Sequence, residues 1–96
     1  MKEIQLSYLD LKTFTEQDAE DYCQINNINS ENITELYLND NELTDISGIK
    51  LFKNVEYLNI DNNKIEDISV LKDLINLKEL VIRNNEITDI CFKRFK

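Results

Sequence analysis

The sequence of 96 residues contains no histidine and a single glycine, Gly48, and these absences exclude several kinds of active site. Without histidine, Cys23 and Cys91 do not complete a zinc site, and they are not spaced as a C-x-x-C pair. One glycine does not make a glycine-rich phosphate loop, and no serine lies in a nucleophile motif. The sequence therefore predicts a protein that is not an enzyme and has no cofactor and no metal site.

Long hydrophobic runs are also absent. No stretch reaches about 18 consecutive apolar residues, the length that a membrane-spanning helix requires. Acidic and polar residues interrupt the apolar positions of residues 1–14, so this segment lacks the hydrophobic region of a signal peptide. We therefore expect a cytoplasmic protein with no contact to a membrane.

Basic residues are few, since 11 lysines and arginines stand against 19 acids and leave a formal net charge of −8. Such a chain repels the phosphate backbone, so direct binding of nucleic acid is not expected. The same charge suits a basic protein partner, and it also keeps a small protein soluble.

What the sequence does contain is a segment that recurs every 22 residues. Residues 33–53, ITELYLNDNELTDISGIKLFK, return as VEYLNIDNNKIEDISVLKDLI from Val55 and as LKELVIRNNEITDI from Leu77. A fixed period of about 20–29 residues with the template L-x-x-L-x-L-x-x-N-x-L is typical of leucine-rich repeats. The template positions are Ile33, Leu36, Leu38, Asn41 and Leu43, then Val55, Leu58, Ile60, Asn63 and Ile65, then Leu77, Leu80, Ile82, Asn85 and Ile87.

Each part of the repeat has a physical meaning. Alternation as in Leu36-Tyr37-Leu38 predicts a short strand with its leucines inward, and the strands must be parallel because each repeat travels out and back. An inward asparagine such as Asn63 can satisfy backbone groups at the turn. Apolar residues spaced by three, as at Ile46 and Ile49, predict a 3-10 or short helical return leg on the convex side.

The first 32 residues do not fit the template, because a shift of 22 residues places Glu16 where the buried Leu38 belongs. Weak alternation over residues 1–14 indicates a half-buried strand or a hairpin. Thr15-Glu16-Gln17-Asp18 resembles a capping box and predicts the start of a helix, which should end near Asn26-Asn27. Such a terminal segment would cover the apolar edge of the first repeat.

The predicted fold class is therefore α/β: a short leucine-rich-repeat solenoid with a parallel concave sheet, 3-10 or short helical convex turns and an N-terminal helical cap. The predicted parts are residues 1–32, an N-terminal cap of strand or hairpin plus helix, and residues 33–96, three repeats with a short C-terminal cap. The third copy departs from the pattern after Ile90, so FKRFK at residues 92–96 either forms that cap or leaves the strand at 79–83 as an open edge. An open edge is a site for pairing with a second copy, as in a homodimer.

The aspartate–isoleucine step after each asparagine turn resembles the bacterial internalin-like class of leucine-rich repeats. The step occurs as Asp45-Ile46, Asp67-Ile68 and Asp89-Ile90, and the resemblance covers residues 33–90. It implies a non-catalytic scaffold whose concave sheet receives a protein partner. Carried over by position, the outward residues of the three strands are Glu35, Tyr37, Asn39, Tyr57, Asn59, Asp61, Glu79, Val81 and Arg83.

Tyrosines beside acids are typical of surfaces that recognise proteins, although tyrosine is also simply a good strand former. Two functions remain open. The first is a module that recruits a protein of unknown identity, basic or not, through the concave face. The second is a small acidic inhibitor, such as a phage-encoded anti-defence protein, that blocks the basic groove of a nucleic-acid enzyme.

Overall fold

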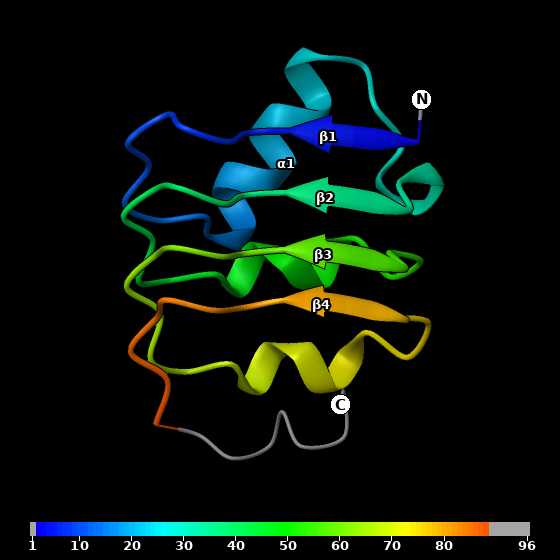
Figure 1. Ribbon diagram of the computed structural model, residues 1–96. Helices are drawn as coiled ribbons and strands as arrows, with labels where there is room; N and C mark the ends of the chain where they lie inside the picture. The colour runs from blue at the N-terminus through cyan, green and yellow to red at the C-terminus, as the bar shows by residue number, and fades with distance from the viewer. Residues whose placement is uncertain (1, 89–96) are drawn as a thin grey trace.

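The computed structural model describes residues 2–88, and its four strands lie side by side in one parallel sheet (Figure 1). The strands are β1 (Glu3–Gln5), β2 (Glu35–Tyr37), β3 (Tyr57–Asn59) and β4 (Glu79–Val81). The helices are α1 (Glu16–Ile25) and the 3-10 helices η1 (Ser30–Asn32), η2 (Ser47–Leu51) and η3 (Ser69–Asp73). This is the predicted small α/β solenoid.

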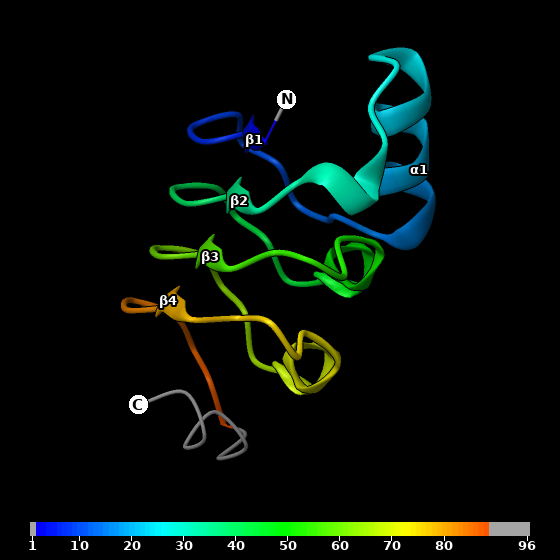
Figure 2. The same cartoon turned by 90° about the vertical axis from the view of Figure 1, so that its right-hand side faces the viewer.

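The core lies between the sheet and the return legs. Figure 2 shows the four strands stacked on one side of the molecule and α1, η2 and η3 stacked on the other. Leu36 and Leu58 point inward from the sheet and are fully buried, as are Ile49 and Leu71 on the return legs. Burying each such side chain stabilises the fold by roughly 1.5–3 kcal/mol. The predicted inward leucines and 3-10 return legs are confirmed.

The asparagines of the repeat form a ladder inside the turns. Asn63 Nδ2 donates to the carbonyl oxygens of Leu38 and Ile60, both at 3.1 Å, and Asn63 Oδ1 accepts from the Leu43 amide at 3.0 Å. Asn41 and Asn85 make equivalent bonds one turn before and one turn after. The predicted role of these side chains, satisfying buried backbone groups, is confirmed.

The residues just before the ladder allow the chain to turn. Asp40, Asn62 and Asn84 have φ values of 61°, 60° and 59°. Aspartate and asparagine enter this left-handed region more readily than other residues with a Cβ atom. In each repeat, therefore, the first residue of the pair forms the turn, and the asparagine that follows satisfies the backbone groups inside it.

Residues 3–14 follow the path of a repeat, although the sequence does not show the 22-residue spacing there. β1 joins the sheet with Ile4 opposite Leu36, and the Phe14 amide donates to the carbonyl oxygen of Asp45 at 2.7 Å. The offset is thus 32 residues instead of 22. The strand alternative for this segment agrees with the structure. The hairpin alternative is wrong, because β1 pairs in parallel with β2.

The added length lies in the segment that contains α1 and η1, and α1 begins and ends where the sequence predicts. The Asp18 amide donates to Thr15 Oγ1 at 3.2 Å, and the Thr15 amide donates to Asp18 Oδ2 at 2.9 Å, so the capping box is complete. The helix is capped at its C-terminal end by Asn26. Ala19 and Cys23 are its buried residues, and the helix packs against η2. It therefore covers the first return leg, while the division of the chain at residue 32 stays a prediction.

The described chain is more open at its C-terminal end. Leu80 and Ile82 are half-buried, whereas the equivalent Leu58 and Ile60 are fully buried. Within residues 2–88, β3 is the strand that pairs with β4. The predicted C-terminal cap and the Asp89-Ile90 step lie outside the described residues. Pairing of a second copy along β4 stays a proposal.

Candidate functional site

The nine site residues predicted from the sequence all lie on the outward side of the sheet. Within β2 and β3 the burial alternates, with Leu36 and Leu58 inside and their strand neighbours at the surface. The strand β1 adds two further outward residues to this surface, and Ser7 after the strand adds a third. We call the surface the sheet face, and it comprises Glu3, Gln5, Ser7, Glu35, Tyr37, Asn39, Tyr57, Asn59, Asp61, Glu79, Val81 and Arg83.

Sequence reasoning missed the contribution of β1. Glu3 lies opposite Glu35 and Gln5 lies opposite Tyr37 in the sheet register. Ser7 Oγ donates to Asn39 Oδ1 at 2.8 Å, which extends the row by one position. The alternation Ile4-x-Leu6 would have revealed these residues if the chain had been aligned at an offset of 32 residues.

The outward side chains form three columns that run across the strands. Glu35 lies opposite Tyr57, and Tyr57 lies opposite Glu79, which gives the first column. The columns are Glu3–Glu35–Tyr57–Glu79, Gln5–Tyr37–Asn59–Val81 and Ser7–Asn39–Asp61–Arg83.

Two tyrosines occupy the middle of the sheet face and touch each other. The ring centroids of Tyr37 and Tyr57 lie 5.2 Å apart, and the ring planes are inclined by 44°. The Tyr37 hydroxyl donates to Glu35 Oε1 at 3.1 Å. Both tyrosines are half-buried, because each ring covers part of its neighbour. The pair is therefore held in position by ring packing and by one hydrogen bond.

The environment of Tyr37 also suppresses its ionisation. Loss of solvent around the phenol, followed by the hydrogen bond to Glu35 and the negative charges of Glu35 and Glu3, raises the pKa of Tyr37 to about 12. At neutral pH the hydroxyl is thus protonated and donates to Glu35. The Tyr37 side chain is therefore uncharged, while the carboxylates of Glu35 and Glu3 lie near it.

Negative charge dominates the sheet face. None of Glu3, Glu35 and Glu79 forms an ion pair with a base of residues 2–88. Arg83 Nη2 lies 3.3 Å from Asp61 Oδ2 at one end of the third column. The other oxygen, Asp61 Oδ1, is buried and has no hydrogen-bond donor among the described residues.

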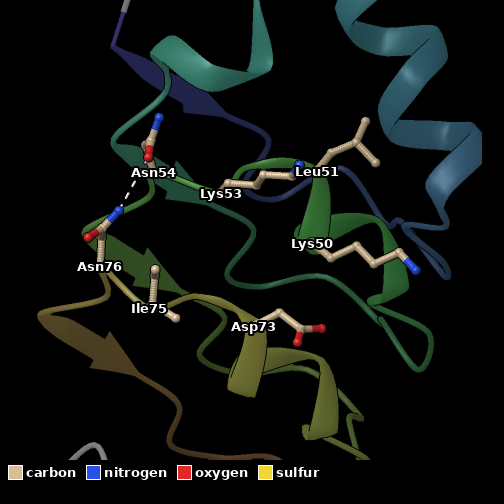
Figure 3. A pocket seen from close by; sticks show the side chains of 7 residues that line it. All are labelled: Lys50, Leu51, Lys53, Asn54, Asp73, Ile75 and Asn76. Atoms are coloured by element: carbon tan, nitrogen blue, oxygen red, sulfur yellow. Dashed lines mark hydrogen bonds between the residues drawn. The ribbon is translucent and has the colours of Figure 1, made fainter.

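A pocket of about 550 Å³ lies on the opposite side of the molecule (Figure 3). Its floor is apolar, with Leu51 and an Ile75 side chain that is 80% exposed. Asn76 Nδ2 donates to Asn54 Oδ1 at 3.2 Å along its rim, and Lys50 is bound to a glutamate of α1. This back pocket is the second surface on which a partner could bind.

In the part of the chain that the structure describes, no group of three or more histidine, cysteine, aspartate or glutamate side chains is arranged to hold a metal ion. None of the helices within residues 2–88 combines the length and the apolar character that crossing a membrane requires.

Comparison with known families agrees with this geometry. A family model described as "Leucine Rich repeats (2 copies)" matches residues 31–73 and again residues 53–93, so the two matches together cover about two-thirds of the chain. No curated protein matches the sequence. The matched region contains β2, β3 and β4 with their turns and return legs.

Proposed function

The chain belongs to the leucine-rich repeat family, and from this premise we propose that it is a non-catalytic module that binds a protein partner through the sheet face. The observation that carries the proposal is the contact between Tyr37 and Tyr57 at the centre of that face. Tyrosine is enriched among the residues that dominate binding energy in protein interfaces, because it combines a large ring with a polar tip.

The sheet orders these side chains before a partner arrives. Parallel backbone hydrogen bonds hold the two strands in register, and Glu35 fixes the Tyr37 hydroxyl. Side chains that are already ordered lose less conformational entropy on association, so more of the contact energy appears as affinity. The negative charge of the face favours a basic partner. We propose a cytoplasmic setting for this interaction.

We also propose that the repeats are of the internalin-like type, on the basis of the aspartate–isoleucine step. Asp45 Oδ1 accepts from the Ser47 amide at 2.9 Å, and Asp67 Oδ1 accepts from the Ser69 amide at 2.8 Å. Each aspartate thus satisfies an amide at the start of a 3-10 return leg, while the isoleucine after it enters the core.

Affinity capture with matched variants tests the function. The immobilised protein is incubated with an extract of the cells that produce it, beside a Tyr37→Ala/Tyr57→Ala variant and an Ile75→Ala variant. A partner of the sheet face should be retained by the wild type and by Ile75→Ala, and lost with the double variant. Retention by the tyrosine variant and loss with Ile75→Ala would instead assign binding to the back pocket.

Circular dichroism is the control for folding, because both tyrosine rings lie on the outward side of the sheet. If the tyrosines are anchors, each truncation should weaken the complex by about 1–3 kcal/mol.

The alternative function, an acidic inhibitor of a nucleic-acid enzyme, is favoured by one observation. The sheet face carries four carboxylates, those of Glu3, Glu35, Asp61 and Glu79, against the single guanidinium of Arg83. An inhibitor that occupies a basic groove should lose affinity steeply between low and moderate salt, because exposed charges are screened. Binding centred on the tyrosine pair should depend much less on salt.

A further inference from the structure

We propose that the sheet face recognises an arginine side chain of the partner, with the guanidinium lying over the Tyr57 ring between the carboxylates of Glu35 and Glu79. This inference rests on the proposed function, since it specifies the chemistry of the protein that the same face binds.

The first column of the sheet face places like charges next to each other. Glu3 lies opposite Glu35 in the register of β1 and β2, and neighbouring strands are about 4.8 Å apart. Like charges in directly opposite positions destabilise a sheet. No base of residues 2–88 pairs with either carboxylate or with Glu79. A cation supplied by a partner would offset this repulsion.

The position of Tyr57 selects a planar cation. Its two register partners in the column are Glu35 on β2 and Glu79 on β4, so the ring lies between two carboxylates. A guanidinium can stack on an aromatic ring and at the same time donate hydrogen bonds sideways to carboxylates. A lysine ammonium is a compact and strongly hydrated charge, so it gains less from the same arrangement.

The Asp61 carboxylate in the third column is less available to a cation than the carboxylates beside Tyr57. Asp61 Oδ1 is buried, so a partner does not reach it in this conformation. Asp61 Oδ2 already lies 3.3 Å from the guanidinium of Arg83.

The two surfaces of the protein differ in charge, and this directs a cationic partner to the sheet face. The back pocket is lined by Lys50 and Lys53 with Asp73, as Figure 3 shows. An arginine would meet the ammonium group of Lys53 there, whereas beside Tyr57 it meets carboxylates that form no ion pair with a base of residues 2–88. Charge complementarity of this kind governs which surfaces associate.

Nuclear magnetic resonance titration with short blocked peptides tests the inference without knowledge of the partner. Three pentapeptides carry arginine, lysine or citrulline between glycines, and citrulline keeps the shape of arginine without its charge. The arginine peptide should shift the amide resonances of β2 and β3 and bind about five-fold more strongly than the citrulline peptide. The lysine peptide should lie between them.

Matched variants show which residues of the protein give the preference for arginine. Tyr57→Ala and Glu35→Gln should each reduce the preference for arginine over citrulline, whereas Glu66→Gln removes an exposed carboxylate outside the sheet face and should not change it. Amide shifts in these variants confined to the neighbourhood of the substitution would show that the fold is retained.

Equal binding of the arginine and citrulline peptides, shifts centred on the back pocket, or no shifts at all would overturn the inference. Each of these results leaves the proposed function intact if affinity capture still depends on the tyrosine pair. If the Tyr37→Ala/Tyr57→Ala variant captured the partner as well as the wild type, that result would contradict the proposed function itself.

Discussion

The amide of Gly48 donates a hydrogen bond to the carbonyl oxygen of Phe14 at 2.7 Å and ties η2 to the segment that leads into α1. A Cβ atom at position 48 would overlap the carbonyl oxygen of Thr15 and lie 2.8 Å from that of Phe14. The equivalent position of the next repeat holds Val70, so the turn itself accepts a side chain. The single glycine of the chain is therefore required by the approach of the N-terminal segment.

Gly48→Ala should lower the free energy of unfolding by about 1–3 kcal/mol, because backbone atoms must move to admit the methyl group. Urea denaturation followed by circular dichroism measures the change. Ser69→Ala, at an exposed position of η3, is the control and should remain within about 0.5 kcal/mol of the wild type. A Gly48→Ala midpoint equal to that of the wild type would contradict the close packing of this segment on η2.

Replacing an asparagine of the ladder should destabilise the protein far more than replacing one on the sheet face. Asn63→Leu leaves the Leu43 amide and the Leu38 and Ile60 carbonyl groups without this partner, at about 1–3 kcal/mol for each group that stays buried and unpaired. Asn59→Ala removes one bond, to the Asp61 amide, at the half-buried outer surface. Chemical denaturation of the two variants compares them directly, and equal midpoints would refute the structural role of the ladder.

The repeats themselves could be predicted from the sequence because their period is constant. Leu36, Leu58 and Leu80 recur at 22 residues, and the inward asparagines recur with them. A fixed period places equivalent residues in register on neighbouring strands, so the outward columns of β2, β3 and β4 follow from the alignment alone. The structure agrees with each of those pairs.

The first strand could not be found in the same way, for two physical reasons. The first return leg contains the ten-residue α1 followed by η1 in place of a single five-residue 3-10 helix, so the offset becomes 32 residues. In addition, Leu9 occupies the position of Asn41, and its amide donates to Asn41 Oδ1 at 2.9 Å. Asn41 thus forms hydrogen bonds with the backbone of the first described turn, which contains no asparagine of its own.

Contacts between side chains on the sheet face could not be predicted from the sequence either. The columns place Tyr37 diagonally from Tyr57, but ring packing depends on rotamers that no periodicity encodes. The same is true of the Tyr37 hydroxyl, which could have pointed to solvent instead of to Glu35.

The titration of Tyr37 reports on that hydrogen bond. Its pKa is raised from 10.0 to about 12, so the folded state holds the proton more tightly than the unfolded state. The resulting contribution to stability is complete below about pH 10 and is lost as the pH rises towards 12. Phenolate absorbance should show a titration near pH 12 that disappears in Tyr37→Phe.

Two further variants separate the causes of that shift. Glu35→Gln should bring the pKa of Tyr37 part of the way back towards 10, because the carboxylate is removed while the ring remains shielded from solvent. Tyr22 lies on α1, away from the sheet face. The control variant Tyr22→Phe should therefore leave the titration near pH 12 in place. An unchanged high-pH titration in Tyr37→Phe would show that another group is responsible.

Site-specific photo-crosslinking in cells that produce the protein tests most directly whether the sheet face binds a protein partner. A benzophenone amino acid replaces Asn59 at the centre of the sheet face in one variant and Ile75 in the back pocket in another. The proposed function predicts a protein adduct from position 59 that is lost on adding Tyr37→Ala, and no adduct from position 75. An adduct from position 75 alone, or no adduct from position 59, would contradict it.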